Sequence, residues 1–248
     1  MKNLYIYMFA LLCCFAMQLS LCAKMKLYAL YTPSHENLKD QFFLPSIQDD
    51  FEIICEFCEQ TCPSAKFMGE GWTQTTMRKV DLIIRAIQEN WGEIFIFSDV
   101  DIQFFAPIQE MILMHMQGKD FVIQKNTPSG VLCSGFFVCR GNEKTLQLWI
   151  DVKKRMEKDG ASDQISLNRC IKRHSKKNPY DIVWDYLPNI FFGGGTLTGR
   201  DWYPGMTLPI PDGIMMHHAN WTKGTKNKIA QLTYVRKEVS KRKKRIKR

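Results

Sequence analysis

A short apolar stretch followed by two aspartates places the strongest constraint on the fold of this chain. Ile94 to Phe97 is a continuous run of β-branched and aromatic residues, which is typical of a strand buried on both faces of an α/β sheet. The run ends in Ser98, Asp99 and Asp101. Ligands of open α/β sheets bind beyond the carboxyl ends of the strands, so the sequence places two acidic side chains where a ligand would lie.

Asp99 and Asp101 are expected to share one side of the chain, because residues two apart in an extended backbone point the same way. Adjacent carboxylates repel one another unless a cation lies between them, and their oxygens suit Mg²⁺ or Mn²⁺. The sequence therefore predicts a divalent metal site here, and repulsion predicts that removing Asp101 would not destabilise the metal-free protein. The alternative is an ordinary turn that happens to contain two aspartates.

Positive charge is concentrated at one end of the chain. The formal net charge is +9, but residues 236–248 hold nine Lys or Arg and one Glu, a net +8 that leaves about +1 elsewhere. We therefore expect no nucleic acid partner. The basic tail is either a solvated, disordered end or a patch that binds an anionic membrane surface. Hydrophobic residues make up 45% of the chain, which is ample for a packed core.

Residues 1–24 form a separate unit. Lys2 precedes a mostly apolar run from Leu4 to Cys22, and Ala23 is a small residue suited to a cleavage site. This pattern predicts a secretory signal peptide or a short signal anchor, and hence a secretory-pathway or membrane-associated protein. If Met25 is the true start, the protein is cytoplasmic. We expect a leader at 1–24, one domain at 25–235 and a basic tail at 236–248.

Six cysteines lie outside the leader: Cys55, Cys58, Cys62, Cys133, Cys139 and Cys170. The first three have a spacing that hints at a metal knuckle, but no fourth ligand follows at zinc-finger spacing. Ordinary buried thiols, or one or two disulfides in an oxidising lumen, are favoured over a structural zinc site.

The remaining chain alternates predicted strands and helices. Strands are predicted at 26–31, 51–55, 94–97, 121–124, 132–139 and 181–186, and helices at 34–45, 74–90, 107–116, 142–158 and 162–174. Thr73, Asn142 and Ser162 are the predicted N-caps. These spacings predict a single α/β domain with a mostly parallel central sheet and an irregular C-terminal third, which includes a glycine-rich loop at 191–199.

A second polar cluster lies near the end of the chain. A short apolar approach ends in His217 and His218, and a neutral imidazole could complete a cation site that the two carboxylates begin. Gly224 would let the backbone approach a phosphate, and Lys226 and Lys228 open the final helix, where positive charge supports anion binding. The alternative is a surface histidine pair on an edge strand.

Four motifs in this order resemble those of nucleotide-diphospho-sugar transferases with a GT-A type, Rossmann-like fold. Phe97 to Phe105, followed by Pro107, resembles the family's Asp-x-Asp segment. The C-terminal cluster matches the family pattern His-x-Asn-x-x-x-Gly-x-x-x-Lys at His218, Asn220, Gly224 and Lys228.

The other two motifs lie between these segments. Cys133-Ser134-Gly135 resembles the family's Asn-Ser-Gly near the sugar, with cysteine in place of asparagine. Asp163-Gln164 resembles the Asp-Gln helix start that faces the donor sugar in retaining members, although Asp is also favoured at any helix N-terminus. Together the resemblance covers roughly residues 26 to 230.

The resemblance implies a metal-dependent glycosyltransferase that moves a sugar, with retention, from a nucleotide-diphosphate donor to a glycan, protein or lipid acceptor. A UDP-sugar is the favoured donor. Mn²⁺ or Mg²⁺ would be held by Asp99, Asp101 and His218, and Asp163 and Gln164 would lie closest to the anomeric centre. The candidate donor-binding residues are Tyr31, Thr32, Lys79, Ser134, Gly135, Asn220, Gly224 and Lys228; of these, Tyr31 and Thr32 are candidates to contact the base and Lys79 to reach a phosphate or sugar.

Two other functions are weighed against this one. Haloacid-dehalogenase-like phosphatases also place Asp-x-Asp after an apolar strand, but their motif continues to Thr or Val where this chain has Gln103, and it lies near the start of the domain. A non-catalytic binding protein on a degenerate transferase scaffold is the second alternative. The presence of Asp99, Asp101 and His218 together argues against such degeneration.

Overall fold

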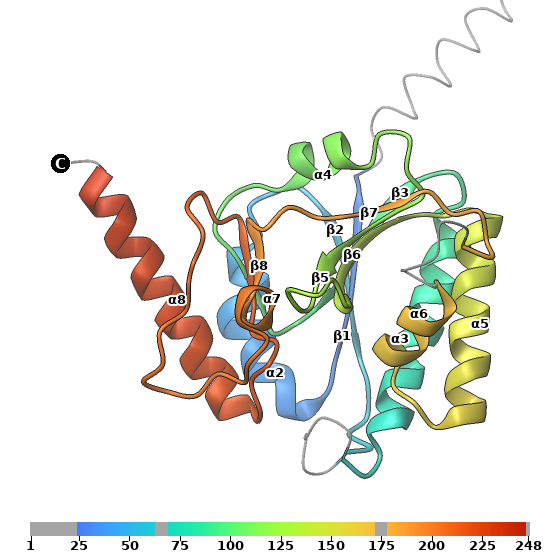
Figure 1. Cartoon of the computed structure of the whole chain (residues 1–248), viewed down its shortest axis with the longest axis horizontal. Coiled ribbons are helices and arrows are strands. Elements are labelled where there is room, and N and C mark those ends of the chain that lie inside the picture. The colour runs from blue at the N-terminus through green and yellow to red at the C-terminus, as the bar shows by residue number, and fades with distance from the viewer. Residues whose placement is uncertain (1–23, 63–68, 172–177, 247–248) are drawn as a thin grey trace, which may run out of the picture.

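The computed structural model describes residues 24–62, 69–171 and 178–246. Its main sheet has six strands in the order β2-β1-β3-β6-β5-β7 (Figure 1). The strands are β1 (Lys26–Tyr31), β2 (Glu52–Phe57), β3 (Ile94–Asp99), β5 (Phe121–Lys125), β6 (Leu132–Arg140) and β7 (Trp184–Tyr186). Only β6 among these six runs against the others, because β1 is parallel to β2 and β3, and β7 is parallel to β5. The predicted, mostly parallel α/β sheet is confirmed.

Three helices cover one face of this sheet, at the right of Figure 1: α3 (Trp72–Glu89), α5 (Glu143–Asp159) and α6 (Asp163–Cys170). The apolar stripe predicted for the first of them is buried, with Val80, Ile83 and Ile87 fully covered. Phe137 of β6 stacks between Phe97 of β3 and Trp149 of α5, at ring-centroid distances of 5.3 and 5.2 Å. This face of the sheet is therefore an apolar core.

The opposite face carries a second, three-stranded sheet in the order β4-β9-β8. Its strands are β4 (Ile102–Phe104), β8 (Phe191–Gly193) and β9 (Met216–His218). Around it lie the short helices α2 (Glu36–Leu38), α4 (Gln109–His115) and α7 (Gly194–Thr198), and the long helix α8 (Thr225–Ile246) (Figure 1). Since β4 follows β3 after only two residues, the chain passes from the large sheet to the small one at Asp99, Val100 and Asp101.

Two of the three predicted N-caps are confirmed. The side chain of Asn142 accepts a hydrogen bond from the backbone N–H of Thr145 in a capping box, and the side chain of Ser162 accepts one from Ile165. The third prediction, Thr73, is wrong. Helix α3 begins at Trp72, two residues before the predicted start at Gln74, and its N-cap is Gly71 at φ +77°, a left-handed conformation that glycine adopts without strain.

Three other element predictions differ from the structure. The segment predicted as a helix at 34–45 is helical without a gap, but its type changes along its length, through η1 (Pro33–His35), α2, η2 (Lys39–Phe43) and η3 (Leu44–Ser46). The predicted glycine-rich loop at 191–199 is strand β8 followed by helix α7, because pairing with β9 organises it. The strand predicted at 181–186 covers only β7, and Asp181 before it adopts φ +53°.

Both ends of the chain bear on localisation. The predicted leader, residues 1–24, lies outside the described part except for Lys24. Residues 236–246 of the basic tail continue α8, and Arg242 and Lys243 donate to the backbone carbonyls of Ile210 and Phe105. Across the described ranges, no helix has the length and apolar character needed to cross a membrane.

All six cysteines outside the leader lie in the described part, and no disulfide joins any two of them. The one or two disulfides considered from the sequence are therefore not formed. Burial raises the pKa of Cys55 to about 11, which keeps this thiol protonated. Within the described residues, the one group of side chains that could hold a metal contains no cysteine.

Candidate active site

The connection between the two sheets brings three candidate metal ligands together. Asp99 is the last residue of β3, and the backbone carbonyl of Asp101 accepts a hydrogen bond of 2.9 Å from Ala219. Strand β4 then pairs antiparallel with β9, with Ile102 opposite His218. This register places the imidazole of His218 beside the carboxylate of Asp101, with 3.3 Å between Nε2 and Oδ1.

Asp99, Asp101 and His218 each offer one ligand atom, and these atoms lie within 4.8 Å of one another. Asp101 and His218 are buried, whereas about a third of the Asp99 side chain is exposed. Gly135 of β6 forms one wall, because a Cβ at this position would lie 2.6 Å from Oδ2 of Asp99 and would also clash with the His218 ring. Gly135 therefore leaves these ligands the room that any side chain would fill.

Each of the two carboxylates already has an ammonium partner in the structure. Lys79 of α3 lies 2.9 Å from Oδ1 of Asp99 and 3.1 Å from Oδ2 of Asp163. Lys228 of α8 forms an ion pair with Oδ2 of Asp101 and also donates to the carbonyl of Ala219. The repulsion expected from the sequence between two unpaired carboxylates is therefore wrong for the metal-free protein, because a lysine pairs with each of them.

The pKa values of the buried groups follow from these pairs. Burial would raise the pKa of Asp101, but Lys228 and His218 lower it well below its usual range. Burial would lower the pKa of His218, but Asp101 outweighs it and raises the value to about 10. Burial likewise opposes the charged form of Lys79, yet Asp163 and Asp99 raise its pKa. The metal-free site is therefore a network of paired charges.

The two candidate catalytic residues lie at the start of α6. Asp163 is buried, and its contact with Lys79 is an ion pair outside hydrogen-bond geometry. Gln164 is half-buried, and its backbone carbonyl accepts a hydrogen bond from Asn168. Since Lys79 contacts both Asp163 and Asp99, the helix start and the Asp-x-Asp segment belong to one site. Ser134, on β6 beside Gly135, is buried.

Tyr31 and Thr32 lie at the carboxyl end of β1, as expected for residues that would contact a base. The Tyr31 ring is half-buried between Phe57, at a centroid distance of 5.7 Å, and the ammonium of Lys39, at 4.4 Å. The Thr32 hydroxyl is buried and lies 3.1 Å from Nδ1 of His35.

Asn220 and Gly224 shape the loop between β9 and α8. The side chain of Asn220 is buried and bonded at both ends, since it accepts from the backbone N–H of Gly195 and donates to Asn126. Gly224 adopts φ +81°, and the space where a Cβ would project is open. Glycine is needed at this position for its backbone conformation rather than for close packing.

Sequence reasoning missed Gln124 and His35. Gln124 is the next-to-last residue of β5 and accepts a hydrogen bond from His218. The signal in the sequence was a polar residue directly after the buried apolar run of the strand, as Ser98 is on β3. The pKa of His35 is lowered, mainly by burial and further by the charge of Lys228, while the charge of Asp101 opposes this shift. No local pattern marks His35.

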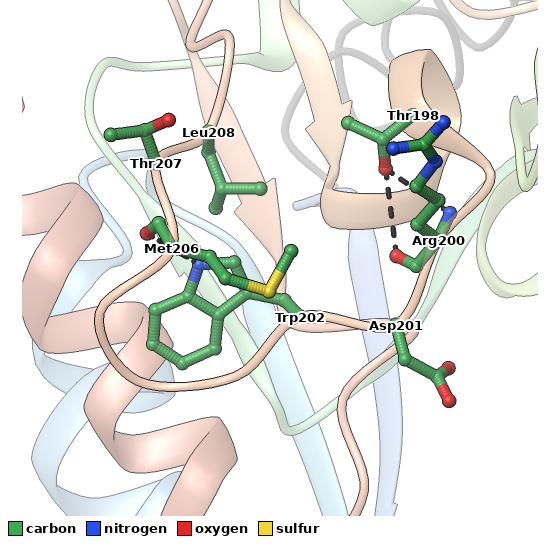
Figure 2. Close-up of a pocket in the computed structure, with 7 residues that line it drawn as sticks. All are labelled: Thr198, Arg200, Asp201, Trp202, Met206, Thr207 and Leu208. Carbon is green, nitrogen blue, oxygen red and sulfur yellow. Dashed lines mark hydrogen bonds between the residues drawn. The ribbon is translucent and has the colours of Figure 1, made fainter.

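A cavity of about 310 Å³ lies next to the loop after β9 (Figure 2). It is lined by Thr198, Arg200, Asp201, Trp202, Met206, Thr207 and Leu208. The backbone N–H of Trp202 donates to the carbonyl of Trp221 at 2.8 Å, and Lys223 pairs with Asp201 at 2.5 Å. Trp221, whose carbonyl holds the cavity loop, is three residues from His218. The α-carbons of these two residues can therefore be at most about 11 Å apart.

Comparison with known proteins identifies the family. The sequence profile described as nucleotide-diphospho-sugar transferase matches residues 55–232, which is more than half of the chain. The chain belongs to the nucleotide-diphospho-sugar transferase family. The resemblance seen in the motifs is thereby confirmed, and the phosphatase alternative is wrong, since it requires another family.

Solved glycosyltransferases with similar folds accompany this match. A glycosyltransferase involved in glycosylation of the major capsid of PBCV-1 is 10% identical, with a TM-score of 0.49, and the alignment covers 69% of the transferase and 85% of that chain. Mouse xyloside xylosyltransferase 1 is 12% identical, with a TM-score of 0.48, covering 80% and 98%. No curated protein matches by sequence. By its family the transferase is a glycosyltransferase of the nucleotide-sugar type, and its fold is α/β with a mostly parallel central sheet.

Proposed function

We propose that the transferase uses Mn²⁺ or Mg²⁺ to transfer a sugar from a UDP-sugar to a glycan, protein or lipid acceptor. The convergence of Asp99, Asp101 and His218 within 4.8 Å carries this proposal. Two carboxylates and an imidazole are a donor set that suits Mn²⁺, and Gly135 keeps the space between them clear. When bound, such a cation would stabilise the negative charge of the departing nucleotide diphosphate.

The lysines of the site support the same chemistry. Lys228 lies near the start of α8 and is about four-fifths buried, so its ammonium acts where water screens it little. We propose that it pairs with the diphosphate when a donor is bound and with Asp101 when the site is empty of donor. Gly224, with open space beside its α-carbon, lets the diphosphate approach the loop. Asn220, bonded at both ends, holds that loop in shape.

We propose that transfer proceeds with retention, with Asp163 and Gln164 closest to the anomeric carbon and Ser134 beside the sugar. Asp163 is buried and carries one ion pair, with Lys79, which supports a fixed position for its carboxylate. Lys79 reaches Asp99 as well, so it couples the helix start to the metal ligands. The reaction's stereochemistry is measured directly by NMR of the first-formed product.

We place the base at Tyr31 and Thr32 and the acceptor at the cavity beside Trp202. The cavity combines hydroxyl groups, one guanidinium and an aromatic ring, which are groups that contact sugars, and it is joined to the loop after β9. Arg200→Ala should raise the acceptor KM and leave the donor KM unchanged. An unchanged acceptor KM would move the acceptor elsewhere.

For localisation, we propose a membrane-associated protein of the secretory pathway. Nucleotide sugars reach an endomembrane lumen through transporters, so a transferase with a leader is supplied with donor there. Association should require residues 1–24, and the basic residues of α8 should add a salt-sensitive part. Fractionation of full-length, leaderless and tail-deleted chains at low and high salt tests this. Salt-resistant membrane binding by the leaderless chain would contradict it.

The direct test of activity is a panel of nucleotide sugars incubated with the purified transferase and Mn²⁺, Mg²⁺ or a chelator. Release of nucleoside diphosphate from a UDP-sugar, lost on chelation and restored by Mn²⁺, is the expected result. Equal release with and without metal would reject the metal dependence. Donor binding without turnover of any donor would favour the non-catalytic alternative.

A further inference from the structure

We propose that Gln124 is a positioning residue that holds the proton of the His218 imidazole on Nδ1, so that Nε2 is the nitrogen offered to a cation. The inference rests on the proposed metal site and adds a residue that lies outside the four motifs described above. The two residues are 94 positions apart in the chain, with Gln124 next to last in β5 and His218 last in β9.

The contact is short and fully enclosed. Oε1 of Gln124 lies 2.9 Å from Nδ1 of His218, and Gln124 and His218 are 1% and 4% exposed. A hydrogen bond in such a place is not exchanged for one with water, so losing either partner leaves a buried polar atom unsatisfied.

The direction of this hydrogen bond follows from the other end of the glutamine amide. Nε2 of Gln124 donates to the backbone carbonyl of Phe191 at 3.0 Å. A carbonyl oxygen can only accept, so the NH₂ group must face Phe191 and the amide oxygen must face His218. The amide oxygen can also only accept. Nδ1 of His218 therefore carries a hydrogen, and Nε2, on the side of Asp101, is the nitrogen that can present a lone pair.

The backbone of β5 is irregular at this residue. The partners of Ile123 and Gln124 on β6 are Phe137 and Cys133, so the pairing skips three residues between consecutive positions. Irregularities of this kind re-aim a side chain next to active sites. Here the skipped segment of β6 includes Gly135, which leaves room for the Asp99 and His218 side chains. One irregularity thus serves both the metal ligands and the residue that orients one of them.

Cys133 is the competing partner of the same nitrogen. Its Sγ lies 3.6 Å from Nδ1 of His218. A thiol is a weak donor and a weak acceptor, and this contact is longer than the one to Gln124. If the thiol donated to Nδ1, the hydrogen would move to Nε2 and block that nitrogen. The proposal therefore assigns the orientation of the ring to Gln124 and not to Cys133.

The test compares three glutamine variants by Mn²⁺ binding without donor, followed by electron paramagnetic resonance. Gln124→Met removes the acceptor at nearly constant volume, and we expect Mn²⁺ affinity to fall about 10- to 100-fold, the usual cost of losing a partner behind a metal ligand. Gln124→Glu keeps an acceptor for Nδ1 while changing the Phe191 contact, and should retain affinity within about 3-fold of wild type. Gln103→Met is the matched control. Gln103 is also a buried glutamine at the sheet junction, but lies on β4 opposite His217, and should bind Mn²⁺ like wild type.

A second measurement does not depend on any Gln124 variant. Nitrogen-15 NMR of histidine-labelled wild type with saturating Mg²⁺ should show the His218 hydrogen on Nδ1, with His218→Ala identifying the signal. A hydrogen on Nε2 would overturn the proposal. The proposal would also be overturned if folded Gln124→Met bound Mn²⁺ as tightly as wild type. The same holds if Cys133→Ala lost Mn²⁺ affinity while Gln124→Met did not. If wild type binds no Mn²⁺, the metal site itself fails; if only the variants behave otherwise than expected, the metal site stands and the role of Gln124 falls.

Discussion

The two sheets of the transferase meet at one site but are held by different kinds of contact. The helix-covered face of the large sheet is packed by rings, such as Phe137 between Phe97 and Trp149. The small sheet buries polar side chains beside its apolar ones. His217 stacks on Phe192 at 5.2 Å and contacts Gln231 at 3.3 Å.

This difference separates stability from orientation. Apolar contacts have little directional preference and their contribution grows with buried area, so the large sheet can supply stability without fixing any angle at the site. Buried hydrogen bonds and ion pairs are directional and cost much when one partner is removed. The small sheet therefore determines where His218, Asn220 and Lys228 point.

The largest effect is expected where the two sheets join, at Asp101. Asp101→Ala should reduce transfer at least roughly 100-fold, a scale typical of lost electrostatic contacts to a transition state. It should also destabilise the metal-free protein by about 3–5 kcal/mol, because His218 and Lys228 lose a buried partner. The repulsion considered from the sequence predicts the opposite sign, so unfolding with and without Mn²⁺ separates the two views. Asp212→Asn is the control, since Asp212 is fully exposed and pairs only with Arg242 in the described structure.

Truncating a side chain in the core of the large sheet should lower the stability of the protein and leave metal binding unchanged. Trp149 is fully buried, and Trp149→Ala should destabilise the transferase by about 3–5 kcal/mol. Below its lowered melting temperature, the variant should bind Mn²⁺ as tightly as wild type. Denaturant unfolding and Mn²⁺ titration measure the two effects. If metal affinity fell in the folded variant, the division of roles between the sheets would be wrong.

Acid should weaken the small sheet through His217. Burial, followed by the nearby charge of His218, lowers the pKa of His217 to about 3. A lowered pKa contributes stability that is complete above the unfolded value near 6.5 and is lost as the pH falls toward 3. Between pH 6.5 and 4.5 the loss is roughly 2–3 kcal/mol. His217→Gln should remove this part of the pH dependence of unfolding; identical slopes for variant and wild type would contradict it.

The smallest effect concerns Asn220-Trp-Thr222, the one Asn-x-Ser/Thr sequon of the chain. Both ends of the Asn220 amide are hydrogen-bonded, one to Gly195 of α7 and the other to Asn126, so a glycan on Nδ2 would break the contact to Asn126. We predict that the sequon stays unmodified when the transferase is produced in a secretory lumen. Mass spectrometry of active protein measures occupancy, and full occupancy would contradict the proposed role of this loop.

The elements of the large sheet were predictable because each carries its own signal. The run from Ile94 to Phe97 predicts a central strand, and Asn142 and Ser162 mark the starts of α5 and α6. The convergence of Asp99, Asp101 and His218 followed from motif spacing and the resemblance together. The ordered motifs predicted the family, which the profile match confirms.

The small sheet carried no comparable signal. Strands β4, β8 and β9 have three residues each, which is too short for a periodic pattern, and their partners lie far away in the sequence. Gln124 and His218 meet only because two strands from separate parts of the chain end at the same point. The lysine partners of the carboxylates were missed for the same reason, since α3 and α8 contact the site only after folding.

The central claim is that one divalent cation binds where the sheets join. Crystals of the transferase soaked in Mn²⁺ and UDP, measured at the manganese absorption edge, test it most directly. We expect one anomalous peak in contact with Asp99, Asp101 and His218, with Lys228 moved from Asp101 toward the diphosphate. An active transferase whose crystals bind UDP and show no peak between these three residues would contradict it.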